Sequence, residues 1–492
     1  MANNNFVFIG GNFSESQLLW VIHIVKGYMN EKKIKGIILN EKYNYNTRKY
    51  ISKVLGEDFK LCEPAKENSK FNKTISVFFH MPASIIYCLI STIKSKILNK
   101  NLAWWQMQFF HAIWDSAIAS GKDGDLKPSL IHKIKSVITC HASFIEGMKY
   151  SKKNIEAYFL GHSVYKTRAF ISGIRFTKST KNIYIQACEC IYKLPINEDI
   201  SVYKLPKEIW DSIIEKQPKN DLLKFKEERL KGITKNFDTK NASKNSIVIN
   251  EKNFSENQIF LHTFRDSPYN FIDKDKIFSD YIDWATFTFK IINQSDEKWS
   301  IRIHPSSFFW GENSISIVQN ILNKLNIPKS SNNLIIENNK ISNLKILEKA
   351  KRIVTYSGTV ALEACSYGIK PITIATTSPY SYNKNLVYKP KNKLEYKSLL
   401  LRNSNSNEFN LKENYKNISW KLLYAIENQI SLSTFLNSDA IFRGDSELKI
   451  KRNYQKIMSC LNQDNSKRKK LFLYGEKFAK GLISISANSY IP

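Results

Sequence analysis

The chain has 492 residues, of which 42% are hydrophobic and 13% aromatic, and its 74 basic and 44 acidic side chains give a formal net charge of +30. This length predicts two or three domains, and this apolar content excludes a wholly disordered chain. The charge indicates an anionic partner such as a phosphorylated substrate or a membrane surface, unless it only reflects heavy use of Lys throughout. Because the basic residues are spread along the chain without a recognisable motif, we expect no nucleic-acid partner.

Cysteine usage and the N-terminus bear on where the protein works. Seven cysteines without a repeated spacing predict reduced thiols in a cytoplasmic protein. The opening sequence MANNNFVFIGGNF lacks the basic and apolar regions of a secretory signal. The segment Ile75–Ile93 is apolar but contains His80 and Pro82, so we expect a buried element or an interfacial one, and no transmembrane helix. The expected location is cytoplasmic, with a peripheral position at the inner face of the cytoplasmic membrane as one option.

The first part of the chain predicts a βαβ unit. An apolar run over residues 5–9 ends in Gly10 and Gly11, and a helix over 14–29 and a strand over 34–42 are expected next. The two glycines are a weak phosphate-binding signal, because the full dinucleotide fingerprint is missing. Downstream we expect an aromatic-rich helical region over 101–120 and short strands over 136–142, 155–165 and 182–194.

A linker and a second alternating region follow. The charged segment 222–245 reads as a helix that runs into small polar residues, and we place a domain boundary near Lys244. Strands are then expected over 258–264, 299–305, 333–338, 352–357 and 370–375, with helices over 278–294, 315–326, 343–350 and 358–368. This alternation with short connections predicts a parallel, doubly wound sheet.

We therefore expect an α/β protein of two Rossmann-like domains followed by C-terminal helices. The N-terminal domain spans residues 1–244, the second Rossmann-like domain 245–418, and a helical extension 419–492. Ligands of open parallel sheets bind outside the carboxyl ends of the strands. The two domains are expected to face each other across a cleft at those ends.

The sequence YSGTVALEACSYG places hydroxyl side chains where a strand meets a helix N-terminus. Free backbone N–H groups and the helix dipole favour an anion there. Gly358 lets a phosphate approach the backbone, and Ser357 and Thr359 can donate to its oxygens. Glu363 lies on the same helix, within reach of ribose hydroxyls. The alternative is ordinary helix capping by the two hydroxyls, with Glu363 on a solvated face.

The sequence KWSIRIHPSSFFW ends a predicted strand on a His-Pro pair. The imidazole of His304 can donate to a phosphate or protonate a leaving phosphate oxygen, and Pro305 forces the chain out of the strand. Arg302 is two residues earlier, so its side chain leaves the sheet on the same face as that of His304. The alternative is a hydrogen-bonded structural histidine.

Two further stretches offer candidates for the acceptor side. In LHTFRDSPYNF, the carboxylate of Asp266 follows a strand and can act as a general base or a nucleophile, although Asp-Ser-Pro is also ordinary turn chemistry. In LGHSVYKTRAF, plain packing is an equal alternative to ligand binding. The acceptor-side candidates are Gly10, Gly11, His162, Tyr165, Arg168 and His262.

Several motifs are absent from the sequence. It contains no Walker loop, no His-Glu-x-x-His, no Asp-x-Asp after a strand and no Gly-x-Ser-x-Gly elbow. We therefore expect no metal and no cofactor, with phosphate held by backbone, hydroxyl, imidazole and guanidinium groups.

The combination resembles bacterial capsule-polysaccharide glycosyltransferases of the GT-B type, in particular the branch with a His-Pro motif and a serine motif. That branch includes sialyltransferases and β-Kdo transferases that use CMP-activated sugars. The resemblance spans roughly residues 258–396 and is carried by HTFRDSP (262–268), DYIDW (280–284), IRIHPS (301–306) and YSGTVALEACSYGIKPI (356–372). It implies that residues 1–244 form an acceptor-side domain and residues 245–418 a nucleotide-sugar-binding domain. It also implies that His304, Ser357 and Thr359 hold the nucleotide phosphate and that Asp266 is the acidic catalytic residue.

The expected function is transfer of a sugar from a nucleotide-activated donor, preferably a CMP-sugar, to a surface polysaccharide or lipopolysaccharide precursor. The partners are then a nucleotide sugar, a glycan or glycolipid acceptor and an anionic membrane surface. The alternatives are a UDP- or GDP-sugar transferase, a GT-B epimerase, and a non-catalytic component of a polysaccharide export assembly.

Overall fold

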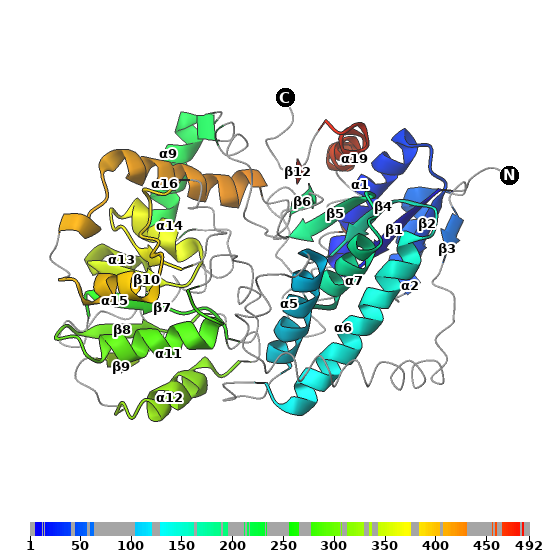
Figure 1. Ribbon diagram of the computed structural model, residues 1–492. Helices are drawn as coiled ribbons and strands as arrows, with labels where there is room; N and C mark the ends of the chain where they lie inside the picture. Colours follow the sequence, from blue (N-terminus) through cyan, green and yellow to red (C-terminus); the bar gives the residue numbers. More distant parts are fainter. Residues whose placement is uncertain are drawn as a thin grey trace. The chain divides into compact units, whose positions relative to one another are not determined.

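The chain forms two compact α/β units (Figure 1). The computed structural model describes residues 5–11, 13, 15–40, 45–56, 60–62, 104–120, 128–161, 165–187, 190–194, 211, 214–215, 217–231, 233, 255–264, 277–305, 307, 312–328, 334–336, 343–374, 383–403, 407–430, 455, 458–459, 465–482 and 485–486. The first unit comprises Met1–Ser120, Pro128–Ile200 and Ile430–Pro492, and the second is built from Ser201–Gln429.

The first unit contains a sheet of Rossmann topology. Its strands are β1 (Phe6–Gly10), β2 (Gly36–Leu39), β3 (Lys60–Cys62), β4 (Ile155–Leu160), β5 (Asn182–Ala187), β6 (Cys190–Lys193) and β12 (Ile485–Ser486). They lie in the order β12-β6-β5-β4-β1-β2-β3. Strands β1 to β5 pair in parallel, whereas β6 and β12 join antiparallel at one edge. Parallel neighbours need crossover helices, so helices cover both faces.

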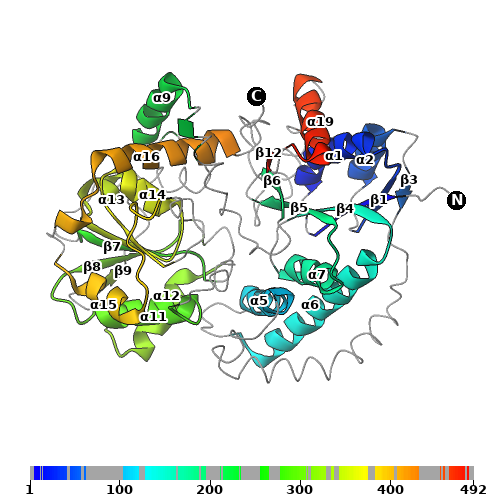
Figure 2. The same cartoon turned by 45° about the horizontal axis from the view of Figure 1, so that its top comes forward.

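Helices lie on both faces of this first sheet (Figure 2). They are α1 (Glu15–Glu31), α2 (Tyr45–Leu55), α5 (Trp104–Ala119), α6 (Leu130–Ser151), α7 (Tyr165–Phe176) and α19 (Asn465–Lys480). Buried side chains of α1, α2 and α19 share one core with Val7 and Ile9 of β1. On the other face, Phe8 of β1 stacks on Phe170 of α7, which packs with α5 and α6.

The second unit contains an all-parallel sheet among its described residues. Its strands are β7 (Asn257–Phe260), β8 (Trp299–Arg302), β9 (Leu334–Ile336), β10 (Arg352–Thr355) and β11 (Ile372–Thr373). They lie in the order β11-β10-β7-β8-β9, and every pairing is parallel. In chain order this is 5-4-1-2-3, the arrangement of a Rossmann domain.

Helices cover this sheet on both faces as well. They are α9 (Lys219–Leu230), α11 (Tyr281–Ile292), α12 (Ser314–Lys324), α13 (Asn343–Lys349), α14 (Thr359–Ser366), α15 (Lys393–Leu401) and α16 (Glu413–Tyr424), with short turns at η5 (Asn407–Phe409) and η6 (Ala425–Ile430). Helices α11, α12 and α15 share a core with Ile259 and Ile301. Helices α13 and α14 pack on the other face, against Phe260 and Ile353.

The fold class predicted from the sequence is confirmed: two Rossmann-like units, with every strand of the second one at its expected place. One predicted element is wrong. Residues 136–142 were expected as a strand because of their β-branched side chains, but they lie inside α6. The buried residues Val137, Cys140 and Phe144 recur at helical spacing, and burial of that stripe outweighs the weak strand propensity of the run.

The unit boundaries differ from those predicted. The N-terminal part of the first unit ends at Ile200, before the predicted boundary. Helix α9, which was expected to lead into a linker, packs on α16 in the second unit. The expected extension 419–492 is divided between the units. Ser419 is buried within α16, which packs on α14, whereas α19 returns to the first unit and packs on α1.

Contact between α1 and α19 is close enough to require glycine. A Cβ on Gly475 would overlap the carbonyl oxygen of Ile24, and one on Gly27 would overlap that of Phe472. On either side of Gly475, Leu471, Tyr474 and Phe478 enter the core of the first unit. The C-terminal helix is therefore an integral part of the N-terminal fold.

Within the described ranges, no helix is both long and apolar enough to cross a membrane. The apolar segment Ile75–Ile93 lies outside those ranges.

Replacing Gly475 tests the contact between α1 and α19. We expect Gly475→Ala to lower the free energy of unfolding by about 2 kcal/mol, because the helices must move apart to admit the methyl group, even though Ala is the better helix former. Urea unfolding measures this change. Lys469→Ala, at an exposed position of the same helix, is the control with little expected effect. An equally stable Gly475→Ala would contradict the packing described.

Candidate functional site

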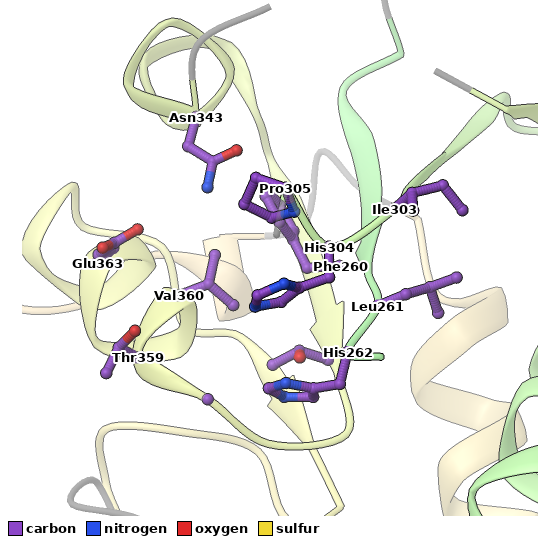
Figure 3. A pocket seen from close by; sticks show the side chains of 12 residues that line it. Phe260, Leu261, His262, Ile303, His304, Pro305, Asn343, Thr359, Val360 and Glu363 are labelled. Atoms are coloured by element: carbon purple, nitrogen blue, oxygen red, sulfur yellow. The ribbon is translucent and has the colours of Figure 1, made fainter. Parts of the chain in front are cut away.

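A pocket lies at the point where the winding of the second sheet reverses. Strands β8 and β9 lie on one side of β7, and β10 and β11 on the other. This arrangement leaves a crevice at the carboxyl ends of β7 and β10, the usual ligand site of such sheets. A pocket of about 70 Å³ occupies this place. It is lined by Phe260, Leu261, His262, Ile303, His304, Pro305, Asn343, Thr355, Gly358, Thr359, Val360 and Glu363 (Figure 3).

Strand alternation places the polar side chains on the pocket side. Ile301 and Ile303 enter the core shared with α11 and α12, so the side chains between and after them leave on the opposite face. There Arg302 donates to the side-chain oxygen of Asn343 at 2.9 Å, and His304 lines the pocket beside that residue. The predicted common direction of Arg302 and His304 is confirmed. Arg302 lies behind Asn343 and is not one of the lining residues.

The ring of His262 packs directly on Gly358. Gly358 has φ +123°, in the region that favours glycine, and a Cβ there would lie 2.7 Å from His262 Cε1. The Nε2 atom of His262 donates to the carbonyl oxygen of Ser357. That oxygen also accepts a hydrogen bond from the Thr355 hydroxyl at 2.8 Å. Glycine is thus required at position 358 both by its backbone and by its neighbour.

His262 is neutral in this environment. Burial, and then the nearby charge of His304, lower its pKa to about 4, although the Ser357 carbonyl favours the protonated form. The two rings lie side by side with centroids 6.1 Å apart (Figure 3). Because Nε2 of His262 carries its single proton toward Ser357, any positive charge of the pair resides on His304.

The N-terminus of α14 opens onto the pocket. Gly358 is its N-cap and provides no side chain to cap the helix, and the next two residues, Thr359 and Val360, line the pocket. The first-turn N–H groups and the helix dipole favour an anion at such a position. The Thr359 hydroxyl adds a donor from the same turn.

Glu363 is held by a buried ion pair. Arg229 of α9 donates to Glu363 with one guanidinium nitrogen and to Glu427 of η6 with the other. Burial by itself would lower the pKa of Arg229, but the two carboxylates outweigh it and raise that pKa. Glu363 is 4% exposed yet still borders the pocket, so the ion pair fixes its direction there. A solvated Glu363, the alternative weighed above, is excluded.

Two side chains behind the pocket hold the chain after β7. The backbone N–H of His262 donates to the Tyr281 hydroxyl at 2.6 Å, and that of Phe264 donates to the buried carboxylate of Glu312 at 3.0 Å. These bonds fix the segment between β7 and the residues that follow Phe264. Sequence analysis missed Tyr281, Glu312, Arg229 and Asn343 as parts of the site. Of these four residues, only Asn343 has a position in the sequence that indicates a role in ligand binding, because it begins the helix that follows the third strand of the second sheet.

The predicted site residues fall into four groups. Five of them line the pocket together: His262, His304, Gly358, Thr359 and Glu363. Ser357 and Arg302 are not among the lining residues: Ser357 takes part through its carbonyl, and Arg302 donates to Asn343. His262, expected on the acceptor side, instead joins the phosphate candidates. Asp266 and His162 lie outside the described residues.

The remaining candidates belong to the first unit. Gly10 is the last residue of β1, Gly11 follows it, and Tyr165 begins α7. Arg168 is 1% exposed and pairs with Asp115 of α5 at 3.3 Å, which favours a packing role. Within the part of the chain that the structure describes, no cluster of three His, Cys, Asp or Glu side chains is placed to hold a metal ion. The expectation of chemistry without a metal stays a prediction.

Comparison with known proteins gives similarity to solved structures only. No family model and no curated protein matches the chain. The β-Kdo 2,4 transferase KpsC of Thermosulfurimonas dismutans is 12% identical, with 56% of this chain and 80% of that one covered at a TM-score of 0.32. The UDP-GlcNAc 2-epimerase of Neisseria meningitidis, bound to UDP-GlcNAc, is 11% identical over 88% of this chain and 100% of that one, with a TM-score of 0.30.

A glycosyltransferase of Rickettsia africae is 12% identical over 93% of this chain and 99% of that one, with a TM-score of 0.26. At such identities and TM-scores, none of these similarities transfers a residue role to this chain.

Gly358→Ala tests the contact beneath His262. The methyl group would strain the backbone and displace the imidazole, so we expect His262 to lose its bond to Ser357. The measurement is the imidazole nitrogen chemical shift of His262, which reports the Nε2–H tautomer. Gly368→Ala is the control, because Gly368 also has positive φ but would meet only the flexible side chain of Lys416. An unchanged His262 signal in Gly358→Ala would contradict the geometry.

The lowered pKa of His262 predicts a pH-dependent stability. The folded protein binds this proton only near pH 4, whereas the unfolded chain binds it near the ordinary value of 6.5. The unfolding free energy therefore falls as the pH drops from 6.5 toward 4. We expect His262→Asn to lose part of this slope, as measured by urea unfolding at several pH values. Equal slopes for the variant and the wild type would show that the pKa of His262 is the same in the folded and unfolded states, which would contradict the lowered pKa.

Proposed function

We propose that this protein is a glycosyltransferase that uses a nucleotide-activated sugar. The observation that carries the proposal is the pocket at the reversal point of the second sheet, where a helix N-terminus, a hydroxyl and an imidazole meet. These groups are all hydrogen-bond donors toward a common space, which is the chemistry of a phosphate site. The carboxylate of Glu363 borders the same space and adds an acceptor for hydroxyl groups.

A CMP-sugar is the favoured donor. The groups at the N-terminus of α14 can hold a phosphate. The His-Pro and serine motifs resemble those of transferases that use CMP-activated sugars, so we favour a CMP-sugar over a UDP- or GDP-sugar as donor. Glu363, oriented by Arg229, would then accept hydrogen bonds from the ribose hydroxyls.

The proposed transfer requires a base and a group that stabilises the leaving phosphate. Asp266 takes the proton of the acceptor hydroxyl, whose oxygen forms a bond to the anomeric carbon of the donor. The bond from that carbon to the phosphate oxygen breaks, and its electron pair stays on the phosphate. Thr359 and the first turn of α14 stabilise this charge, and His304 donates a proton or a hydrogen bond to the same oxygen.

The proposed acceptor is a glycan or glycolipid precursor of a surface polysaccharide. An enzyme acting on such a precursor works at the inner face of the cytoplasmic membrane. The net charge of +30 supports this placement, because anionic lipids attract basic proteins.

Calorimetric titration with CMP, UMP, CDP and UDP tests the proposal directly. We expect CMP to bind most tightly, and Thr359→Val and His304→Ala each to weaken it by about tenfold or more, since each removes a hydrogen bond to a charged group. His132→Ala on α6 is the matched control, since it removes a histidine of the first unit. Release of CMP from CMP-sugars should require Asp266, with Asp266→Asn retaining CMP binding.

Each other outcome favours a different function. Tighter binding of UDP than of CMP would favour a UDP-sugar transferase or an epimerase. Absence of nucleotide binding, or equal affinity in wild type, Thr359→Val and His304→Ala, would favour a non-catalytic protein.

A further inference from the structure

Three helices form the outer layer on one face of the first unit. Helix α1 lies between α2 and α19, and all three bury apolar side chains in the same core above the sheet (Figure 2). Helix α1 is buried almost throughout, so the exposed sides of this layer belong to α2, α19 and the turn that follows α1. The basic residues on these exposed sides are not required for packing of the helices.

Helix α19 presents basic side chains outward at helical spacing. It carries six basic residues and a single acidic one, Glu476. Leu471, Tyr474 and Phe478 are buried on α1, whereas Lys469, Lys470 and Lys480 are exposed. Side chains three and four residues apart share a helix face. Lys470, Leu473, Lys477 and Lys480 follow one another at steps of three or four residues and so form one stripe along α19, beside Lys469.

Helix α2 and the turn after α1 extend this charge. Helix α2 has three basic residues and no acidic one, and Lys49 and Lys53 are exposed one turn apart. The turn between α1 and β2 exposes three more lysines. We define the basic face by its exposed or half-exposed lysines: Lys32, Lys33, Lys35, Lys49, Lys53, Lys469, Lys470, Lys477 and Lys480.

Few acidic groups offset this charge among the described residues. Glu31 pairs with Lys480 at 3.3 Å and is half exposed itself. Positive charges near this face also affect a buried histidine. After burial, the charges of Arg468 and Lys26 help to lower the pKa of His23, on α1, to about 4. An excess of like charge on one face costs folding free energy, so a partner that neutralises it would be favoured.

Apolar side chains are exposed among these lysines. Leu473 is 39% exposed and lies on the stripe between Lys470 and Lys477. Leu482, just after α19, is 68% exposed, and Tyr45 at the start of α2 is 76% exposed. Lysines with apolar side chains between them are typical of surfaces that rest on a bilayer, where the ammonium groups meet lipid phosphates and the apolar groups enter the interface.

We propose that the basic face is a docking surface for an anionic lipid bilayer. Nucleic acid would neutralise the lysines equally well, but it offers nothing to the exposed leucines, since its phosphates and base edges are polar. A bilayer satisfies both sets of side chains at once. The face belongs to the first unit and the pocket to the second, so no pocket residue is part of the face.

This inference gives the membrane contact of the proposed function a definite surface, and its test does not depend on catalysis. Binding to vesicles is measured by sedimentation, once with phosphatidylcholine alone and once with added phosphatidylglycerol. The test variant replaces Lys49, Lys53, Lys469 and Lys470 with Gln. The control replaces Lys384, Lys389, Lys391 and Lys397, all exposed in the second unit, so both variants have the same net charge.

We expect wild type and control to bind the anionic vesicles, and the test variant to bind at least about tenfold more weakly, since each basic residue near such a surface contributes roughly fivefold. Leu473→Ser should also weaken binding without any change in charge. Equal losses in both quadruple variants, or none in the test variant, would overturn the proposal. So would unchanged binding by Leu473→Ser, or single-stranded DNA bound as tightly as the anionic vesicles.

Discussion

The contact between the His262 ring and Gly358 is the constraint on which the second unit's site depends. It joins the end of β7 to the turn between β10 and α14, which are distant in sequence and adjacent only because those strands pair in parallel. A side chain at position 358 would separate them and close the approach to the helix N-terminus. The same contact fixes the His262 tautomer through the Ser357 carbonyl. The contact between His262 and Gly358 therefore sets both the shape of the pocket and the ring nitrogen of His262 that carries the proton.

Packing around the pocket also determines where positive and negative charges lie. His262 is kept neutral by burial, so a cation in the imidazole pair falls on His304. Glu363 keeps its carboxylate at the pocket because Arg229 compensates it from behind, and Arg229 in turn is shared with Glu427. A buried ion pair of this kind contributes little net stability, because desolvation of both charges offsets their attraction. The ion pair instead orients Glu363. Hydrogen-bond donors lie at the N-terminus of α14, and the carboxylate of Glu363, an acceptor, lies one turn further along the same helix.

The alternating strands and helices of the second unit were predictable from the sequence, because buried parallel strands are short apolar runs and their connections are short. The side-chain directions of Arg302 and His304 followed from strand alternation alone. The roles of Arg229 and Glu312 were not predictable, since each depends on a contact between elements that no local pattern relates. Residues 136–142 of α6 were predicted as a strand because β-branched residues are common in strands. The helical spacing of the buried residues is visible only in the structure. The unit boundary was missed because a polar, charged segment looks like a linker even when one side of it packs.

The return of α19 to the first unit has a consequence for synthesis of the chain. Most of the second unit is continuous in sequence and is complete once Gln429 has left the ribosome. The first unit lacks part of its core until Leu471, Tyr474 and Phe478 have been synthesised, although its strand β1 precedes the whole second unit in the sequence. Domains usually fold in the order in which they are synthesised. Here the later domain matures first, and the earlier one keeps apolar surface open to chaperones until α19 has been synthesised.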